Sequence, residues 1–362
     1  MAWGALFVES GRLAVAAPGP GSVMAIGPGS VMAMRALRLH ELGEPVDVLR
    51  IEELPTPVPG PGEVRVDVAA AALNFPDVLL CRGLYQEKPP LPFTPGVEMS
   101  GVVSAIGEGV TRFSVGDRVL GSPNFVNGGL TEQTLAHERG LAKLVDTMDF
   151  DAAAALRITY HTGHVALHRR ANLQRGETVL VHAGAGGVGS AAIQLAKAHG
   201  CKVVATAGGP DKVEVCRQLG ADLAIDYRAN DFVDAVKEFT GGRGADVIYD
   251  PVGGDTYDRS TKVIAWEGRI LINGFTSGRM AEAKTNHILI KNYSVVGVHW
   301  GAYSRHEPQI NDVIHDDLMA LHAAGKINPL VSERVGLADA ADALARLGDR
   351  GTVGKIVVHP SR

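Results

Sequence analysis

The first third of the chain alternates apolar and polar positions in the manner typical of β-strands. Residues 63–70, Glu-Val-Arg-Val-Asp-Val-Ala-Ala, follow this period of two. Turn-forming clusters rich in glycine, proline and asparagine interrupt the apolar runs at residues 55–62, 107–109 and 127–129. Several short strands separated by such turns predict a small barrel-like β domain between Met34 and about Ala155.

Beyond Leu156 the pattern changes to apolar runs of strand length that alternate with segments of helix length. This alternation predicts an α/β domain, with a parallel sheet and helices on both of its faces. The expected strands are residues 178–183, 202–207, 223–226, 245–250 and 269–273, and the expected helices are residues 187–199, 211–219, 231–239 and 256–265.

The last part of the chain returns to β structure after a helical segment at 308–324, with apolar runs at 330–335 and 355–359. We therefore expect a discontinuous β domain at 34–157 and 304–362, and the α/β domain at 158–303. A length of 362 residues fits two domains.

Residues 1–33 are rich in glycine, alanine, proline and serine, and are expected to form a loose extension. An upstream start codon would account for them. They lack the positively charged region with which a secretory signal begins.

The composition is that of an ordinary globular protein, with 46% hydrophobic and 21% charged residues. The 35 basic and 40 acidic residues give a net charge of −5, which favours neither nucleic acid nor an anionic membrane as a partner. No run of 18 apolar residues occurs, so no membrane-spanning helix is expected. The three cysteines form no CxxC pair, and this usage favours a reduced, cytoplasmic compartment.

One motif points directly to a ligand. Gly184-Ala-Gly186-Gly187-Val188-Gly189 follows an expected strand and precedes an expected helix, which is the context that a GxGxxG motif requires. Gly184 would permit a sharp turn, Gly186 the approach of a pyrophosphate, and Gly189 the packing of the helix on the sheet. The phosphates would meet free N–H groups at the positive end of the helix dipole. We therefore expect a dinucleotide site.

The end of the second expected strand of this domain favours NADP over NAD. An NAD site usually places an acid there to bind the ribose 2′-hydroxyl, whereas residues 203–209 end in Ala-Gly208-Gly209. Asp211 follows, but it is better explained as a helix cap. The ammonium of Lys212 would suit a 2′-phosphate, although a solvated lysine at a helix start is the alternative.

The glycine-rich loop and its flanks, residues 176–197, resemble the signature of the quinone oxidoreductase/ζ-crystallin family of medium-chain dehydrogenase/reductases. The resemblance extends over most of 34–360. It implies a GroES-like β-barrel catalytic domain and a Rossmann domain with a doubly wound parallel sheet, and it places the cofactor in the cleft between them. It also implies a homodimer or homotetramer that pairs the cofactor-domain sheets. The supporting segments are 74–77, 82–85, 95–98 and 113–119.

The usual zinc ligands of related alcohol dehydrogenases are missing from the sequence. Those enzymes place a Cys and a Gly-His-Glu in the barrel domain, where this chain has Asn74 and Gly-Val97-Glu. Neither Asn nor Val can supply a thiolate or an imidazole. His161, His164 and His168 can share a helix face and imitate a metal cluster, but three partly exposed helix histidines are the simpler interpretation. We expect no metal site.

Without a Lewis acid, simple alcohol oxidation is disfavoured, and an acceptor that is already electrophilic suits the site better. The resemblance places Asn74 near the nicotinamide, where it would orient a substrate carbonyl or carboxamide. It gives Tyr85 the role of hydrogen-bond or proton donor to the forming enolate. Asp77 matches the family's Asn-x-x-Asp pattern, with capping of the local helix as the alternative role. Leu79 stands where some members have a second tyrosine, so water is an alternative proton donor.

Further cofactor contacts follow from the resemblance, position by position. Thr162 would lie on the nicotinamide side, Tyr227 over the adenosine phosphate, and Arg350 near the same phosphate. Loops after a strand, such as the one with Asn273 and Phe275, line the cofactor crevice at the carboxyl end of the sheet. The expected cofactor residues are Thr162, Gly184, Gly186, Gly187, Val188, Gly189, Gly208, Lys212, Tyr227, Asn273, Phe275 and Arg350.

Together these observations predict a cytoplasmic, zinc-free reductase of quinones or enones that uses NADPH and acts as a homodimer. Two alternatives remain open. One is an enoyl-thioester reductase of the same superfamily, which would require a basic groove for CoA or a carrier. The other is a non-catalytic NADPH-binding protein.

Overall fold

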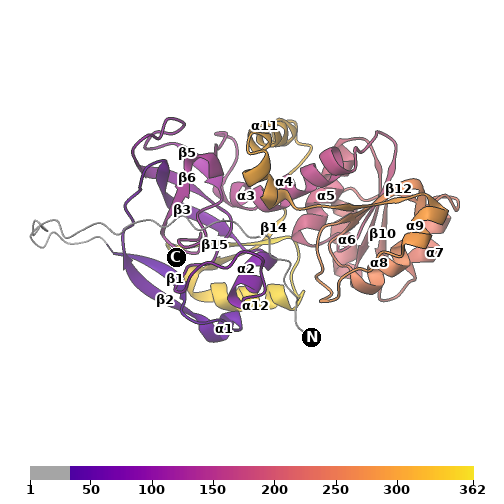
Figure 1. Cartoon of the computed structure of the whole chain (residues 1–362), viewed down its shortest axis with the longest axis horizontal. Helices are drawn as coiled ribbons and strands as arrows, with labels where there is room; N and C mark the ends of the chain where they lie inside the picture. The colour runs from indigo at the N-terminus through magenta and orange to yellow at the C-terminus, as the bar shows by residue number, and fades with distance from the viewer. Residues whose placement is uncertain (1–32) are drawn as a thin grey trace, which may run out of the picture. The chain divides into compact units, whose positions relative to one another are not determined.

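Two large β-sheets organise Ala33–Arg362, the part of the chain that this computed structural model describes (Figure 1). Residues 1–32, for which we expect a loose extension, lie outside the described residues. Ala33 was assigned to that extension, but it begins strand β1 (Ala33–Leu39) because it pairs with Pro55 of β2 (Leu49–Pro55).

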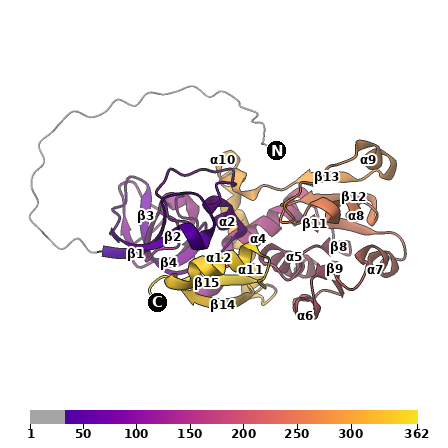
Figure 2. The same ribbon diagram turned by 90° about the horizontal axis from the view of Figure 1, so that it is seen from below.

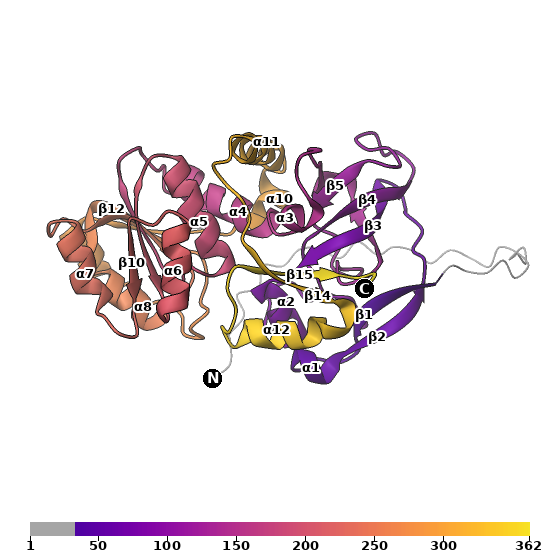
Figure 3. The same ribbon diagram turned by 180° about the vertical axis from the view of Figure 1, so that it is seen from behind.

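The first sheet is parallel, with the strand order β10-β9-β8-β11-β12-β13. This is the doubly wound order, and it reverses between β8 and β11. Successive side chains of a strand point to opposite faces, so Val179 and Val203 enter one core with α4, α5 and α6 (Figure 3). Leu180 and Val204 enter the other core with α7 and α8. The expected parallel sheet with helices on both faces is confirmed.

Most elements of this sheet lie close to the expected ranges, but the sequence pattern predicts neither α9 nor β13, and one expected helix is partly wrong. The helix expected at 256–265 is wrong in its second half, because α8 ends at Ser260 and Ile264 already pairs with Ala245. A short apolar run is compatible with a helix or a strand, and here its pairing with β11 makes it a strand. The strands are β8 (Thr178–Val181), β9 (Lys202–Ala207), β10 (Leu223–Asp226), β11 (Ala245–Asp250), β12 (Ile264–Ile272) and β13 (Ser294–Gly297). The helices are α5 (Gly187–Ala198), α6 (Pro210–Gln218), α7 (Phe232–Phe239), α8 (Gly254–Ser260) and α9 (Thr285–Lys291).

The second sheet is mixed, with the order β14-β15-β3-β4-β5-β7 and β6 paired to β3. The end of the chain enters this sheet, since Val357 of β15 pairs with Ala72 of β3. Helix α12 lies beside α2, as Figure 2 shows. The strands are β3 (Glu63–Ala72), β4 (Met99–Ile106), β5 (Arg118–Gly121), β6 (Gln133–His137), β7 (Leu141–Lys143), β14 (Val331–Gly336) and β15 (Lys355–His359).

Several helices connect or cover the two sheets. Ile314 and Leu318 of α11 pack into the same core as α4, although residues 304–362 are expected in the β domain. Because this helix packs against the other domain's core, the expected domain boundaries at 157 and 304 stay a prediction. The helices are α1 (Pro45–Val48), α2 (Phe75–Cys81), α3 (Phe150–Ala154), α4 (Arg157–His164), α10 (Tyr303–His306), α11 (Ile310–Ala323) and α12 (Ala340–Gly348). The shorter or irregular turns are η1 (Glu138–Gly140), the π-helical η2 (Val165–Arg170), η3 (Trp300–Ala302) and η4 (Leu337–Asp339).

Candidate cofactor and substrate site

The glycine-rich loop joins β8 to α5 at the point where the strand order reverses. A Cβ on Gly189 would lie 2.2 Å from the carbonyl oxygen of Ala183, so only glycine allows the helix to pack this closely. The first N–H groups of a helix have no partner within it, and those of α5 begin at this loop. Such a helix start is suited to a pyrophosphate.

Gly184 lies in the turn after β8, as expected, but not in a left-handed conformation. The left-handed backbone belongs to Ala183, with a φ of 52°, and Gly184 has no such φ. A Cβ on Gly184 would instead lie 2.9 Å from the Sγ of Cys216 and 3.0 Å from the Cβ of Ala205. Gly184 is therefore required by packing between the loop and its neighbours.

The segment at 350–355 returns to this loop from far along the chain. The N–H of Gly354 donates to the carbonyl of Ala185 at 2.7 Å. The Nζ of Lys212 donates to the backbone carbonyl of Arg350 at 2.9 Å. Tertiary contacts thus bring Lys212 to the backbone of Arg350, and the roles of both residues at a phosphate stay predictions.

At the carboxyl end of β9, the ring of Tyr227 and the guanidinium of Arg228 lie over Gly208. A Cβ on Gly208 would come within 2.8 Å of the Tyr227 Oη and 3.0 Å of the Arg228 Nε. Arg228 was missed by our sequence reasoning; its position directly after Tyr227 was the available signal. Partial burial and the charge of Arg228 lower the pKa of Lys212, so two cations approach each other here.

The nearby acid, Asp226, bonds to the backbone of the turns that follow β9 and β10. The carboxylate of Asp226 accepts the N–H groups of Gly209 at 2.9 Å and of Arg228 at 3.0 Å. These bonds hold the pKa of Asp226 below its usual value. The carboxylate therefore stabilises these turns, and the side chains around Gly208 fit a dinucleotide that carries an additional phosphate.

Asn74 lies at the N-terminus of α2 in a buried polar network. Its Nδ2 donates to the Oε1 of Glu98 at 2.7 Å, and its Oδ1 accepts from the Nζ of Lys355 at 2.6 Å. A Cβ on Gly187 would lie 3.0 Å from the Cδ of Lys355, so this network adjoins the glycine-rich loop. Sequence reasoning missed Lys355, although a lysine that opens an apolar strand was a usable signal.

Asp77 is fully buried, and its contacts favour a structural role over a catalytic one. Its carboxylate accepts the N–H of Asn74 at 2.8 Å, which caps α2, and the N–H groups of Gly96 and Val97 at 3.0 and 3.1 Å. Burial raises the pKa of Asp77 to about 7, against the effect of these backbone donors. Tyr85 lies in the loop after α2, where burial and then the charge of Asp77 raise its pKa, so the phenol keeps its proton.

The remaining expected cofactor residues lie on α4 and at the carboxyl edge of the sheet. Thr162 is half-buried one turn after Thr159, whose Cγ2 would be 3.3 Å from a Cβ on Gly187. The Nδ2 of Asn273 donates to the Oη of Tyr249 at 2.7 Å, at the ends of β11 and β12. Phe275 follows in the next loop and is 38% exposed.

The three histidines of α4 and η2 do not share one environment. His161 is fully buried and not partly exposed as expected, because α11 and Trp300 cover its face of the helix. Its Nε2 lies 2.9 Å from the Nη1 of Arg157. His164 contacts Asp317, and His168 packs between the rings of His164 and His199. Among residues 33–362, no three His, Cys, Asp or Glu side chains converge as metal ligands.

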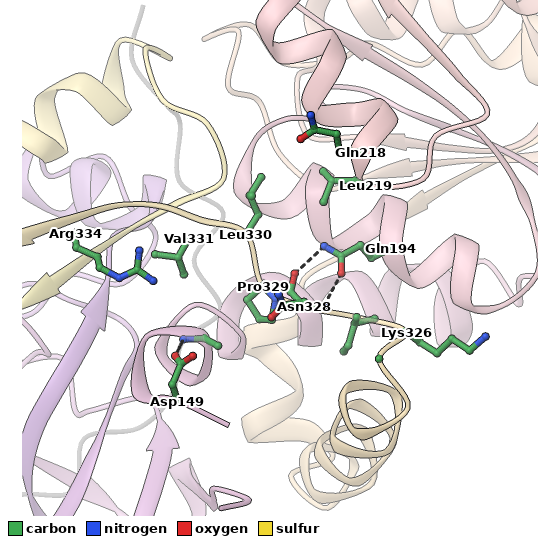
Figure 4. Close-up of a pocket in the computed structure, with 13 residues that line it drawn as sticks. Asp149, Gln194, Gln218, Leu219, Lys326, Asn328, Pro329, Leu330, Val331 and Arg334 are labelled. Carbon is green, nitrogen blue, oxygen red and sulfur yellow. Dashed lines mark hydrogen bonds between the residues drawn. The ribbon is translucent and has the colours of Figure 1, made fainter. Parts of the chain in front are cut away.

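A pocket of 520 Å³ lies along α5, α6 and the segment 325–331 (Figure 4), and the carbonyl of its lining residue Leu330 accepts the N–H of Lys355 at 2.8 Å. The side chain of Gln194 makes two hydrogen bonds to the backbone of Asn328 there, at 2.9 and 2.6 Å. None of the expected site residues lines it. Within the described residues, no helix combines the length and the apolar character needed to cross a membrane.

Two protein families match separate parts of this chain. Residues 60–146 match the alcohol dehydrogenase GroES-like domain, and residues 187–316 match the zinc-binding dehydrogenase family. A quinone oxidoreductase-like protein 2 homolog of Nematostella vectensis is 41% identical over 90% of this chain and 88% of that protein. The chain belongs to the quinone oxidoreductase family. As a family member it is an oxidoreductase of the medium-chain dehydrogenase/reductase superfamily, and the resemblance seen in the sequence is confirmed.

Solved structures of the quinone oxidoreductase family share the fold. The enzyme of Pseudomonas syringae pv. Tomato DC3000 is 36% identical, with a TM-score of 0.84 over 91% of this chain and 100% of that chain. The Escherichia coli quinone oxidoreductase, complexed with NADPH, is 31% identical, with a TM-score of 0.83 over 90% and 100%. The expected combination of a GroES-like and a Rossmann domain is confirmed.

Proposed function

We propose that this protein uses NADPH to reduce quinones or activated C=C bonds such as those of enones, by direct hydride transfer. The observation that carries the proposal is the positive charge of Arg228 and Lys212 beside Gly208, at the carboxyl end of β9, a strand that ends without an acid. The NADPH complex of the related Escherichia coli enzyme supports the same cofactor. The nicotinamide would supply the hydride, and the chain would orient it.

The protein's own contribution would be positioning and the exclusion of water. The start of α5 and the cluster at Gly208 would hold the two phosphate-bearing parts of the cofactor. Tyr85 would donate a hydrogen bond to the oxygen on which negative charge develops, and its raised pKa keeps the phenolic proton available. Asn74 and Val97 stand where zinc relatives hold ligands, so we assign no Lewis acid to the reaction.

Stopped-flow measurement of NADPH oxidation with a panel of quinones, enones and enoyl-CoA esters tests this function. Turnover with quinones or enones, above the rate with enoyl-CoA, supports it. Faster turnover with enoyl-CoA would favour the thioester reductase. Tight NADPH binding without turnover of any acceptor would leave a non-catalytic NADPH-binding protein.

We also propose a homodimer that forms at the edge strand β13. This strand pairs only with β12 among the described residues, so its other side can accept a second copy. Nearby apolar side chains are exposed, with Leu289 at 80% and Ile290 at 71% on α9. Sedimentation of Leu289→Glu should show a monomer, whereas a monomeric wild-type chain would overturn the proposal.

A further inference from the structure

Lys355 lies in a hydrogen-bond network that leaves none of its donors unused. Its ammonium carries three hydrogens, and three acceptors surround it: the carbonyl of Leu73 at 2.6 Å, the Oδ1 of Asn74 at 2.6 Å and the Oε1 of Glu98 at 2.8 Å. Lys355 is 4% exposed and Glu98 is fully buried. This pair is therefore a buried ion pair in which both charges are hydrogen-bonded.

The two charges determine how the Asn74 carboxamide is oriented. An ammonium can only donate, so it must face the Oδ1 of Asn74, and a carboxylate can only accept, so it must face Nδ2. Both Nδ2 hydrogens are committed, one to Glu98 at 2.7 Å and one to the carbonyl of Ala72 at 3.0 Å. By hydrogen-bond geometry, Oδ1 keeps one lone pair; it lies near the N–H of Asp77 in the capping box of α2, and this N–H already donates to the backbone carbonyl of Asn74 at 3.0 Å.

The same pair connects segments from three parts of the chain. The Oε2 of Glu98 accepts the N–H of Ile158 at 2.7 Å, which fixes the start of α4. The aliphatic part of Lys355 packs against Gly187 at the start of α5. The orientation of Asn74 is thus tied to the glycine-rich loop and to α4, both of which adjoin the proposed cofactor site.

We infer that Lys355 and Glu98 are positioning residues that hold Asn74 as a hydrogen-bond acceptor for an N–H or O–H group of the molecule in the cleft. The sequence suggested that Asn74 orients a substrate carbonyl or carboxamide, and the network selects the acceptor role for it. The inference deepens the proposed function and rests on it for the kinetic test, whereas a spectroscopic test does not require turnover.

The kinetic test uses Glu98→Gln. The NH₂ group of the new glutamine would face another donor in either orientation. In one it would face the Nδ2 of Asn74 and the Nζ of Lys355, and in the other the N–H of Ile158. We expect kcat to fall about tenfold, the value of roughly one hydrogen bond. Asn74→Ala combined with Glu98→Gln should be no slower than Asn74→Ala alone, because both changes remove one function. Multiplied effects in the double variant would overturn the inference.

Lys197→Met is the matched control, because Lys197 forms an exposed ion pair with Asp222 in the last turn of α5, whereas the network adjoins the first turn. Its kcat should equal that of the wild type. A loss as large as that of Glu98→Gln would mean that removal of any ion pair slows the enzyme, and this too would overturn the inference.

The spectroscopic test follows the Asn74 side-chain NH₂ by ¹H–¹⁵N NMR, with Asn74→Ser to identify the resonance. In the wild type we expect slow exchange with solvent, since both hydrogens are bonded and buried. The double variant Glu98→Gln/Lys355→Met removes both charges, so neither charge is left unpaired. The amide of the new glutamine can then donate to the Oδ1 of Asn74. This bond would require the Asn74 carboxamide to turn over. Exchange should then become faster in a chain that remains folded by circular dichroism. Fast exchange in the wild type would refute the positioning role, even if no acceptor is ever turned over.

Discussion

Arg228 and Lys212 are single side chains whose charges have a specific expected consequence. Each would contact a phosphate that NADPH carries and NADH lacks. We expect Arg228→Ala and Lys212→Ala each to weaken NADPH binding about tenfold, or ~1.4 kcal/mol, and to leave NADH binding unchanged. Fluorescence titration with both cofactors measures this.

Arg217→Ala provides the control for this pair, because Arg217 lies on the same helix as Lys212, exposed and paired with Glu214. It should change neither affinity. Equal losses for NADPH and NADH in the Arg228 or Lys212 variant would show that these cations support the fold of the loop rather than the 2′-phosphate.

Tyr85 is the proposed donor at the substrate end. Removal of its hydroxyl in Tyr85→Phe should lower kcat and kcat/KM together, by about tenfold to a hundredfold, because the bond strengthens only as charge develops. NADPH affinity should stay unchanged, since the pyrophosphate site belongs to α5. Steady-state kinetics with one quinone and one enone measure the effect, and wild-type rates with both would assign the proton to water.

At the scale of elements, the junction of β8 and α5 depends on glycine for a steric reason. In Gly189→Ala the new methyl would lie 2.2 Å from the carbonyl oxygen of Ala183, and the nearest atoms all belong to the backbone, which cannot move aside as a flexible side chain can. We expect a loss of about 1–3 kcal/mol in the free energy of unfolding, together with weaker NADPH binding. Urea unfolding measures the free energy of unfolding, and fluorescence titration with NADPH measures the change in affinity.

Gly301→Ala is the comparison for that variant, because its Cβ would meet the nearest side chain at an ordinary 3.6 Å. It should unfold nearly as the wild type does. If Gly189→Ala were as stable as Gly301→Ala, the close packing at the start of α5 would be contradicted.

On the scale of the whole molecule, buried histidines make stability depend on pH. Burial lowers the pKa of His168 to about 4 and of His182 to about 3, and burial beside Arg157 holds the pKa of His161 well below its usual value. The unfolded chain therefore takes up protons first as the pH falls through about 6.5. Asp77 acts in the opposite direction, because its pKa is raised to about 7 in the folded state. Stability should be retained above pH 6.5 and lost below it.

His168→Gln tests this dependence. Between pH 6.5 and 5, one such histidine accounts for about 2 kcal/mol of lost stability. Urea unfolding at pH 7.5 and pH 5 should show a smaller loss for this variant than for the wild type by roughly that amount. The same exchange at exposed His306 should leave the loss as in the wild type. An unchanged pH dependence in His168→Gln would rule out this histidine as the source.

The sequence by itself determined the parallel sheet, the place of the glycine-rich loop and the family. These features have local causes, since alternating apolar positions, turn residues and a strand–glycine–helix order each act within about twenty residues. Strands β9, β10, β11 and β15 begin and end where the pattern predicts. The pattern failed at Ile264, where the short apolar run took its structure from a partner strand.

Only the tertiary structure decided which side chains meet at the site. Lys355 lies 281 positions from Asn74 along the chain, yet its Nζ is 2.6 Å from the Oδ1 of Asn74. Arg228 reaches Gly208 across two strands, and His161 is buried because α11 packs over it. No local pattern encodes these contacts, because each depends on how separate elements pack or pair, and for Lys355 the pairing of β15 with β3 returns the end of the chain to the site. The orientation of Asn74, and with it the choice between donor and acceptor, is therefore a property of the folded molecule alone.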